Sequence, residues 1–157
     1  MTIAPIVHTV EVKASPARAF DLFTRRIGDW WPSTKTPAKN PFVLLAIEPR
    51  VGGRWYERDA EGNELQWGEV AAYEPPGRLL LIWQLSTKWA HDPNMTSEVE
   101  LTFAPLPGGG TKVTLEHRRL EQLGADAAEH AERLNSGWPT RIADYAAYAD
   151  AHAEADA

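Results

Sequence analysis

The sequence predicts an α+β fold, in which a curved antiparallel sheet of about six to seven strands packs against a long C-terminal helix. Apolar and polar residues alternate with a period of two through the middle of the chain, and the last third changes to the helical period. A short helical pair follows the first strand. Because the sheet has one apolar face and only the final helix is long enough to cover it, we expect these two elements to pack together.

The first strand is expected at 7–13, where the residues alternate loosely. Ser15 is a good N-cap and Pro16 is tolerated at the first helical position, so the segment ASPARAFDLFT is expected to form a helix with its phenylalanines facing inward. Pro32 ends this helical region, because proline cannot continue a helix. A loop follows over 33–41.

Six further strands are expected between this loop and the C-terminal helix. Glycine, proline and asparagine separate them, as is typical of hairpin turns. Their expected ranges are Phe42 to Glu48, Arg54 to Arg58, Glu64 to Tyr73, Leu79 to Leu85, Ser97 to Phe103 and Val113 to His117. The fifth of these alternates most regularly, which is typical of a strand with one buried and one solvated face.

A continuous apolar stripe runs through the last third of the chain at spacings of three and four residues. Its members are Ala127, Ala131, Leu134, Trp138, Ile142, Tyr145 and Ala149. Pro139 lies inside this stripe and removes one helical hydrogen bond, so we expect a kink or a restart near Ser136 and Gly137. Because the stripe stays in phase across Pro139, one kinked helix is favoured over two unrelated helices.

Length and composition exclude several classes of protein. The 157 residues fit a single domain over 1–157, with a core at about 5–150 and a tail at 151–157 that is expected to fray. The net charge of −6 argues against nucleic-acid binding. No apolar run is long enough for a membrane span and no signal peptide is recognisable, so we expect a soluble, cytoplasmic protein without a membrane partner. The sequence leaves a homodimer open.

No catalytic residue, metal site or cofactor is predicted. Cysteine is absent, which excludes thiol nucleophiles and cysteine-ligated metals. The five histidines include no HxxxH or HExxH spacing, and no GxSxG nucleophile motif occurs. The GGGTK segment lacks the spacing of a phosphate-binding loop and is interpreted as a hairpin turn.

Tryptophan is unusually frequent, with seven residues at positions 30, 31, 55, 67, 83, 89 and 138. Such a cluster indicates either a bulky core or a ligand cavity lined by aromatic faces. For any single tryptophan, the core is the more common explanation.

The order and spacing of several segments resemble the START-like SRPBCC superfamily and, within it, the heat shock protein 90 ATPase activator-like domain family. These segments are SPARAFDLFT, GDWWP, VGGRWYERDAEGNE, WGEVAAYEPPGRLLLIW, GGGTKVTLEH and GWPTRIADYAAY, and the resemblance covers about 5–150. It implies a helix-grip fold, in which the sheet wraps the C-terminal helix and leaves a cavity between them. It is much less specific for any activity.

The candidate ligand-binding residues are those expected to face this cavity, namely Trp55, Trp83, His117, Trp138, Ile142 and Tyr145. The facing of Trp55 and Trp67 stays open, because both sides of their strands carry aromatic or charged residues. His117 is interpreted first as a core histidine, and second as a polar anchor or proton-transfer group with Glu57 as its acidic counterpart.

Three functions are compatible with these observations. The favoured function is the binding of a small apolar or aromatic molecule in the cavity, without catalysis. The first alternative is an enzyme of the polyketide cyclase or aromatase kind, in which the pocket orients a substrate and a few polar groups move protons. The second alternative, a chaperone partner that regulates the heat shock protein 90 ATPase in stress response, follows from the family name alone and is not favoured.

Overall fold

The structure, a computed structural model, describes residues 2–154 and contains seven strands and four helical segments. The strands are β1 (Ile6–Val12), β2 (Phe42–Ile47), β3 (Arg54–Asp59), β4 (Glu64–Glu74), β5 (Arg78–Trp83), β6 (Ser97–Pro105) and β7 (Thr111–Arg118). The helices are α1 (Pro16–Thr24), α2 (Ile27–Trp30) and α3 (Ala127–Ala151), with a 3₁₀ turn, η1 (Leu120–Leu123), before α3. The sequence did not predict η1.

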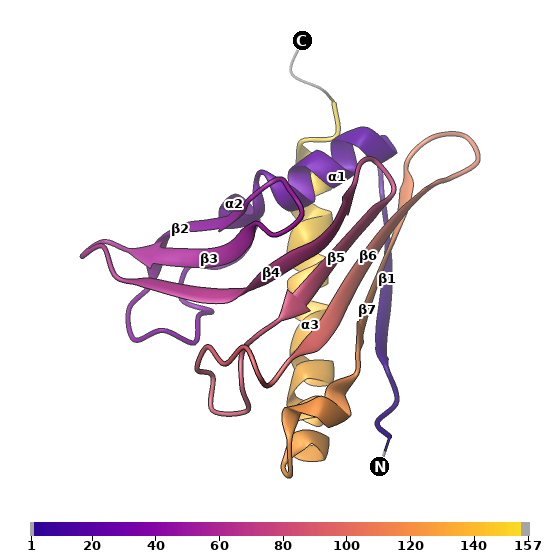
Figure 1. Cartoon of the computed structure of the whole chain (residues 1–157). Coiled ribbons are helices and arrows are strands. Elements are labelled where there is room, and N and C mark those ends of the chain that lie inside the picture. The colour runs from indigo at the N-terminus through magenta and orange to yellow at the C-terminus, as the bar shows by residue number, and fades with distance from the viewer. Residues whose placement is uncertain (1, 155–157) are drawn as a thin grey trace.

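All seven strands form one antiparallel sheet in the order β1-β7-β6-β5-β4-β3-β2. The sheet curls around α3, and α1 and α2 lie at one end of the layer between them (Figure 1). The backbone of α3 approaches β1, η1, α1 and α2 most closely. This arrangement confirms the predicted fold class, a helix-grip-like α+β fold.

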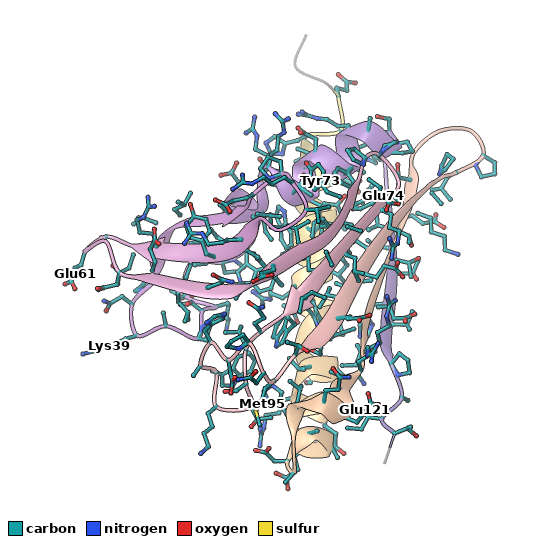
Figure 2. The ribbon with its side chains drawn as sticks, in the orientation of Figure 1. Lys39, Glu61, Tyr73, Glu74, Met95 and Glu121 are labelled. Carbon is teal, nitrogen blue, oxygen red and sulfur yellow. The ribbon has the colours of Figure 1, made fainter. Side chains whose placement is uncertain are left out.

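The core lies between the sheet and α3, where side chains fill the layer, whereas Lys39 and Glu61 project outward (Figure 2). The expected alternation is confirmed in β6 and β7, whose inward-facing side chains are buried. They are Val99, Leu101, Phe103, Val113, Leu115 and His117. α1 begins as expected, with the Ser15 hydroxyl accepting a hydrogen bond from the Arg18 amide.

The C-terminal helix is a single uninterrupted element with Pro139 inside it, so the favoured alternative of one helix is confirmed. Every residue of the predicted apolar stripe is buried. Pro139 lies on the exposed side, where water can bond to the Asn135 carbonyl that has lost its helical donor. Of the tail expected to fray, 155–157 lie outside the described residues, and the His152 ring stacks on Tyr148.

A register shift between β3 and β4 determines how their aromatic residues face. Trp55 pairs with Gly68 and Tyr56 pairs with Gln66, so Trp67 is an extra residue without a pairing partner. This bulge brings the Trp67 ring to within 5.4 Å of the Trp55 ring. Regular alternation does not predict this arrangement.

Gly68 is required at this bulge because the backbone of β5 passes directly over it. A Cβ at Gly68 would lie 2.0 Å from the Ile82 carbonyl oxygen and 3.4 Å from a ring carbon of Trp55. We therefore expect Gly68→Ala to lower the free energy of unfolding by about 1–3 kcal/mol or more, as measured by urea denaturation. Gly77→Ala is the matched control, because a Cβ there meets no atom within 4 Å. Equal stability of the two variants would contradict this close approach.

Candidate functional site

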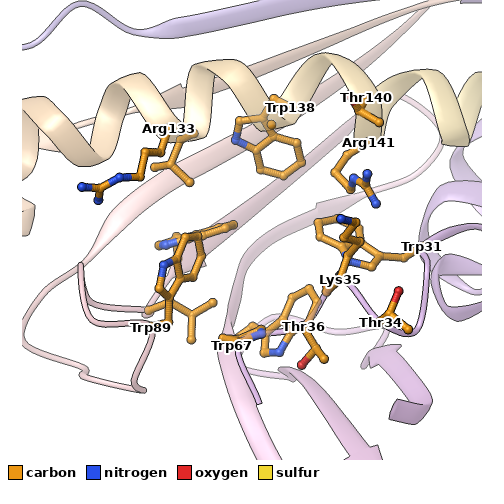
Figure 3. Close-up of a pocket in the computed structure, with 15 residues that line it drawn as sticks. Trp31, Thr34, Lys35, Thr36, Trp67, Trp89, Arg133, Trp138, Thr140 and Arg141 are labelled. Atoms are coloured by element: carbon orange, nitrogen blue, oxygen red, sulfur yellow. Dashed lines mark hydrogen bonds between the residues drawn. The ribbon is translucent and has the colours of Figure 1, made fainter. Parts of the chain in front are cut away.

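A cavity of about 740 Å³ lies between α3 and the residues opposite it on β4, β5 and two loops. Figure 3 shows Trp138 extending from α3 toward Trp31, Trp67 and Trp89. The lining residues are Trp31, Thr34, Lys35, Thr36, Pro37, Trp67, Trp83, Leu85, Trp89, Arg133, Leu134, Gly137, Trp138, Thr140 and Arg141. The volume is within the range of roughly 300–1,000 Å³ that is usual for small-molecule sites.

All seven tryptophans belong to one network of ring contacts. Centroid distances between neighbouring rings range from 5.1 Å for Trp31 and Trp67 to 6.3 Å for Trp83 and Trp89, and the rings meet edge-on or tilted. Five of the seven line the cavity, while Trp30 and Trp55 lie behind them. Both explanations of the tryptophan cluster therefore hold, because the rings form part of the core and also the cavity wall.

Two loops bring aromatic residues to the cavity that strand periodicity could not place. Trp31 directly follows α2, and its indole Nε1 donates a hydrogen bond to the Lys35 carbonyl oxygen, which fixes the 31–35 turn. Trp89 lies in the loop between β5 and β6 with a left-handed φ of 60°. Its ring packs 4.9 Å from that of His130 on α3. These contacts position both rings at the cavity.

The structure places the six sequence-predicted residues in two groups. Trp83 and Trp138 line the cavity. The other four, Trp55, His117, Ile142 and Tyr145, are at most 4% exposed and lie in the core behind the lining. Tyr145 donates a hydrogen bond to the Ala19 carbonyl oxygen, which joins α3 to α1.

Both ring nitrogens of His117 have partners, and Nδ1 links the sheet to α3. The Trp138 indole donates a hydrogen bond to Nδ1 over 3.1 Å, so this nitrogen is the acceptor. Nε2 then carries the proton and faces the Ser97 hydroxyl at 2.7 Å. Burial, together with the nearby His130, lowers the pKa of His117 to about 3. His117 is therefore a neutral core histidine beneath Trp138, in agreement with its first interpretation.

Glu57 is 1% exposed and lies on the other side of the site. Its Oε1 accepts hydrogen bonds from the Trp67 indole over 2.9 Å and from the Thr36 hydroxyl. Thr36 and Trp67 both line the cavity. The carboxylate that was considered as a partner of His117 is thus bonded instead to two residues of the cavity wall.

The lining also contains cationic residues that sequence reasoning did not select. Lys35 comes from the loop after α2, whereas Arg133 and Arg141 come from α3 about two turns apart. The two arginines lie four residues before and four residues after Gly137, so helical spacing puts all three on one face, and this is the sequence signal that could have identified them. Among the described residues that line the cavity, none is acidic.

The described residues offer no group of three or more His, Asp or Glu side chains placed to bind a metal ion. None of their helices has the length and apolar character needed to cross a membrane.

His117→Leu tests the link between sheet and helix. Leucine leaves the Trp138 indole and the Ser97 hydroxyl without partners, so the variant should be about 1–3 kcal/mol less stable at pH 7.5. In the unfolded chain the histidine binds a proton near pH 6.5, which the folded protein excludes down to about pH 3. The free energy of unfolding of the wild type should therefore fall by about 1.4 kcal/mol per pH unit below 6.5 more than that of the variant. The difference in stability between the two proteins should shrink as the pH falls.

Urea denaturation of both proteins between pH 7.5 and 4.5 measures this difference. Burial also lowers the pKa of His130. Because His130 is present in both proteins, its contribution to the pH dependence cancels. Parallel pH profiles would contradict a neutral His117 in the folded state.

Comparisons with known proteins agree with this fold. The anthrahydroquino-γ-pyrone synthase Txn09 is 36% identical, with a TM-score of 0.66 over 92% of this chain and 96% of that one. The self-sacrificing resistance protein CalC from Micromonospora echinospora is 29% identical, with a TM-score of 0.73 over 97% of each chain. Protein MLL2253 from Mesorhizobium loti, at 23% identity and a TM-score of 0.63 over 94% of this chain and 97% of that one, shares the fold.

No curated protein sequence matches the chain significantly. The model of the family described as Activator of Hsp90 ATPase homolog 1-like protein matches residues 13–149, which include every strand that borders the cavity and nearly all of α3. The chain therefore belongs to the Activator of Hsp90 ATPase homolog 1-like protein family.

Proposed function

We propose that the protein binds a small aromatic molecule in the cavity beneath α3. The observation that carries this proposal is the cavity wall, in which five tryptophans surround about 740 Å³ of space. Aromatic rings offer a flat ligand large apolar contact areas and favourable edge-on and offset geometries. Burial of the ligand against them is favourable by roughly 25 cal/mol per Å² of apolar area.

The similar proteins support an aromatic ligand in particular. The name of the synthase that is 36% identical to this chain refers to an anthrahydroquinone, which is a flat fused-ring compound. Such a ring system suits a cavity whose wall is made mostly of indole faces and edges. Thr34, Thr36 and Thr140 add hydroxyl groups that can orient polar substituents.

Gly137 offers a way to fill this cavity without disturbing the fold. It lines the cavity in the middle of α3, and a Cβ there would meet no atom within 4 Å outside its own helix and chain neighbours. Gly137→Leu should therefore weaken binding of the neutral fluorophore N-phenyl-1-naphthylamine at least fivefold, because the leucine occupies ligand space. Titrations with the fluorophore, followed by its emission and by tryptophan quenching, measure the change.

Gly137→Ala is the matched control. Both variants should be more stable than the wild type by about 0.5–1 kcal/mol, because glycine is unfavourable in a helix. Only the leucine variant should lose binding. Equal binding by the two variants, or no saturable binding to the wild type at one site per chain, would contradict the proposed function.

The enzymatic alternative is favoured by one observation, the buried Glu57 carboxylate behind the Thr36 hydroxyl. Such a pair could take a proton from a bound ring through the hydroxyl, as cyclase or aromatase chemistry requires. Anthrone, a tricyclic ketone with an acidic ring C–H, is a suitable probe. If the alternative holds, the protein should accelerate deuterium exchange at this carbon in D₂O.

Glu57→Gln keeps an oxygen that can accept the Trp67 hydrogen bond but removes the base. It should lower the accelerated exchange by about 10²- to 10⁴-fold without changing anthrone affinity. Exchange followed by proton NMR gives the rates, and thermal unfolding verifies that the variant is folded. A wild-type exchange rate equal to that of buffer would leave binding alone as the function.

A further inference from the structure

We propose that the ligand is an aromatic anion, that is, a flat ring system with an ionised acidic group, and that Arg141 binds this group. This inference deepens the proposed function and depends on it. It follows from the charges of the cavity, the position of Arg141 and the unsatisfied donors in the wall.

The cavity is positive although the chain as a whole is negative. The protein has 22 acidic and 16 basic residues, yet the charged residues lining the cavity are Lys35, Arg133 and Arg141, with no acidic one among the described lining residues. The buried Glu57 carboxylate lies behind Thr36 and Trp67, to which it is hydrogen-bonded. Arg133 and Arg141 have acidic partners on α3, Glu129 and Asp144, but only the cationic groups of these pairs line the cavity, which favours an anionic ligand.

Arg141 is the best placed of the three cations. Its side chain is 14% exposed, compared with 60% for Arg133, so its charge is less screened by water. Figure 3 shows Arg133 and Arg141 leaving α3 on either side of Trp138, with the Arg141 guanidinium directed toward Trp31. An aromatic ligand that binds beside Trp138 would therefore have the Arg141 guanidinium next to the edge of its ring system.

Arg141 retains donors for a ligand although it has an ion-pair partner. Its Nη1 lies 3.3 Å from Asp144 Oδ2, but the geometry is not that of a hydrogen bond, and both atoms are buried without hydrogen-bond partners among the described residues. A guanidinium has five N–H donors, so the remaining ones can bind an anionic oxygen.

Trp83 provides a second unsatisfied donor in the same wall. It is 4% exposed, and its buried indole nitrogen has no acceptor in the described part of the chain. Buried donors in folded proteins are nearly always paired, so an orphaned one beside a cavity indicates a missing acceptor. Trp83 and Arg141 can thus both donate to oxygen acceptors, which an acidic aromatic molecule carries and a pure hydrocarbon lacks.

Two probes with one ring skeleton test the proposal. 8-Anilinonaphthalene-1-sulfonate is anionic, and N-phenyl-1-naphthylamine is the same molecule without the sulfonate. Arg141→Gln should weaken binding of the anionic probe by about tenfold or more, because it removes a partly buried charge-assisted contact, and should change binding of the neutral probe less than twofold. Arg133→Gln should weaken the anionic probe by only about two- to threefold, since this residue is exposed.

Two further variants control for charge and folding. Arg50→Gln removes the same charge from an exposed position outside the cavity and should leave both affinities unchanged. Arg141→Lys retains the charge and should restore most of the anion affinity. Raising the salt concentration should weaken the anionic probe more than the neutral one.

The outcomes separate this inference from the proposed function. If neither probe binds the wild type saturably, the proposed function fails. If the neutral probe binds but Arg141→Gln weakens both probes equally or neither, the cavity still binds aromatic molecules and the anion proposal is overturned. If Arg141→Gln loses affinity for both probes and Arg141→Lys does not restore it, Arg141 has a structural role. This outcome likewise overturns the anion proposal.

Discussion

The structure depends on burying the concave face of a seven-stranded open sheet under one helix. Without α3, the inward side chains of β5, β6 and β7 would be exposed to water. His117, Trp138 and Ser97 connect the two layers through hydrogen bonds at the centre of this interface. Because these polar groups satisfy one another, they lie deep in an apolar layer without a large desolvation cost. The position of α3 above the sheet is fixed at the point where the cavity begins.

The cavity is a consequence of how α3 lies on the sheet. Its backbone comes closest to β1, η1, α1 and α2, which leaves a wider gap on the side of β3, β4 and β5. Only large side chains can reach across this gap, and tryptophans from both sides do so. Rigid rings that meet edge-on cannot fill the space as flexible aliphatic chains would, so room for a ligand remains among them. The same residues thus stabilise the fold and form the cavity wall.

The charged residues of the cavity wall are the feature on which the proposed preference for an anion depends. The outer face of the sheet pairs its acidic and basic residues with one another, as Arg118 does with Glu98, Glu100 and Glu116. In the cavity, Arg133 and Arg141 pair with Glu129 and Asp144 of α3, but these carboxylates are not part of the lining, so the charged groups that face a ligand are cationic. Glu57 is close but bonded to Thr36 and Trp67, which places a proton acceptor behind the wall. This arrangement is what the proposed binding of an aromatic anion and the alternative role of Glu57 as a base depend on.

The sequence alone predicted the fold class, the inward faces of β6 and β7 and the stripe of α3, because each follows from a local period of two or 3.6 residues. It also identified Trp83 and Trp138, which lie on such periodic faces and line the cavity. Tertiary packing places His117 beneath Trp138, a bulge brings Trp67 to the wall, and loops add Trp31 and Trp89. No local pattern predicts these positions. Local sequence patterns likewise did not predict that Lys35, Arg133 and Arg141 line the cavity. These features arise where separate elements meet, and a periodic pattern specifies which face a residue occupies but not which distant residue it meets there.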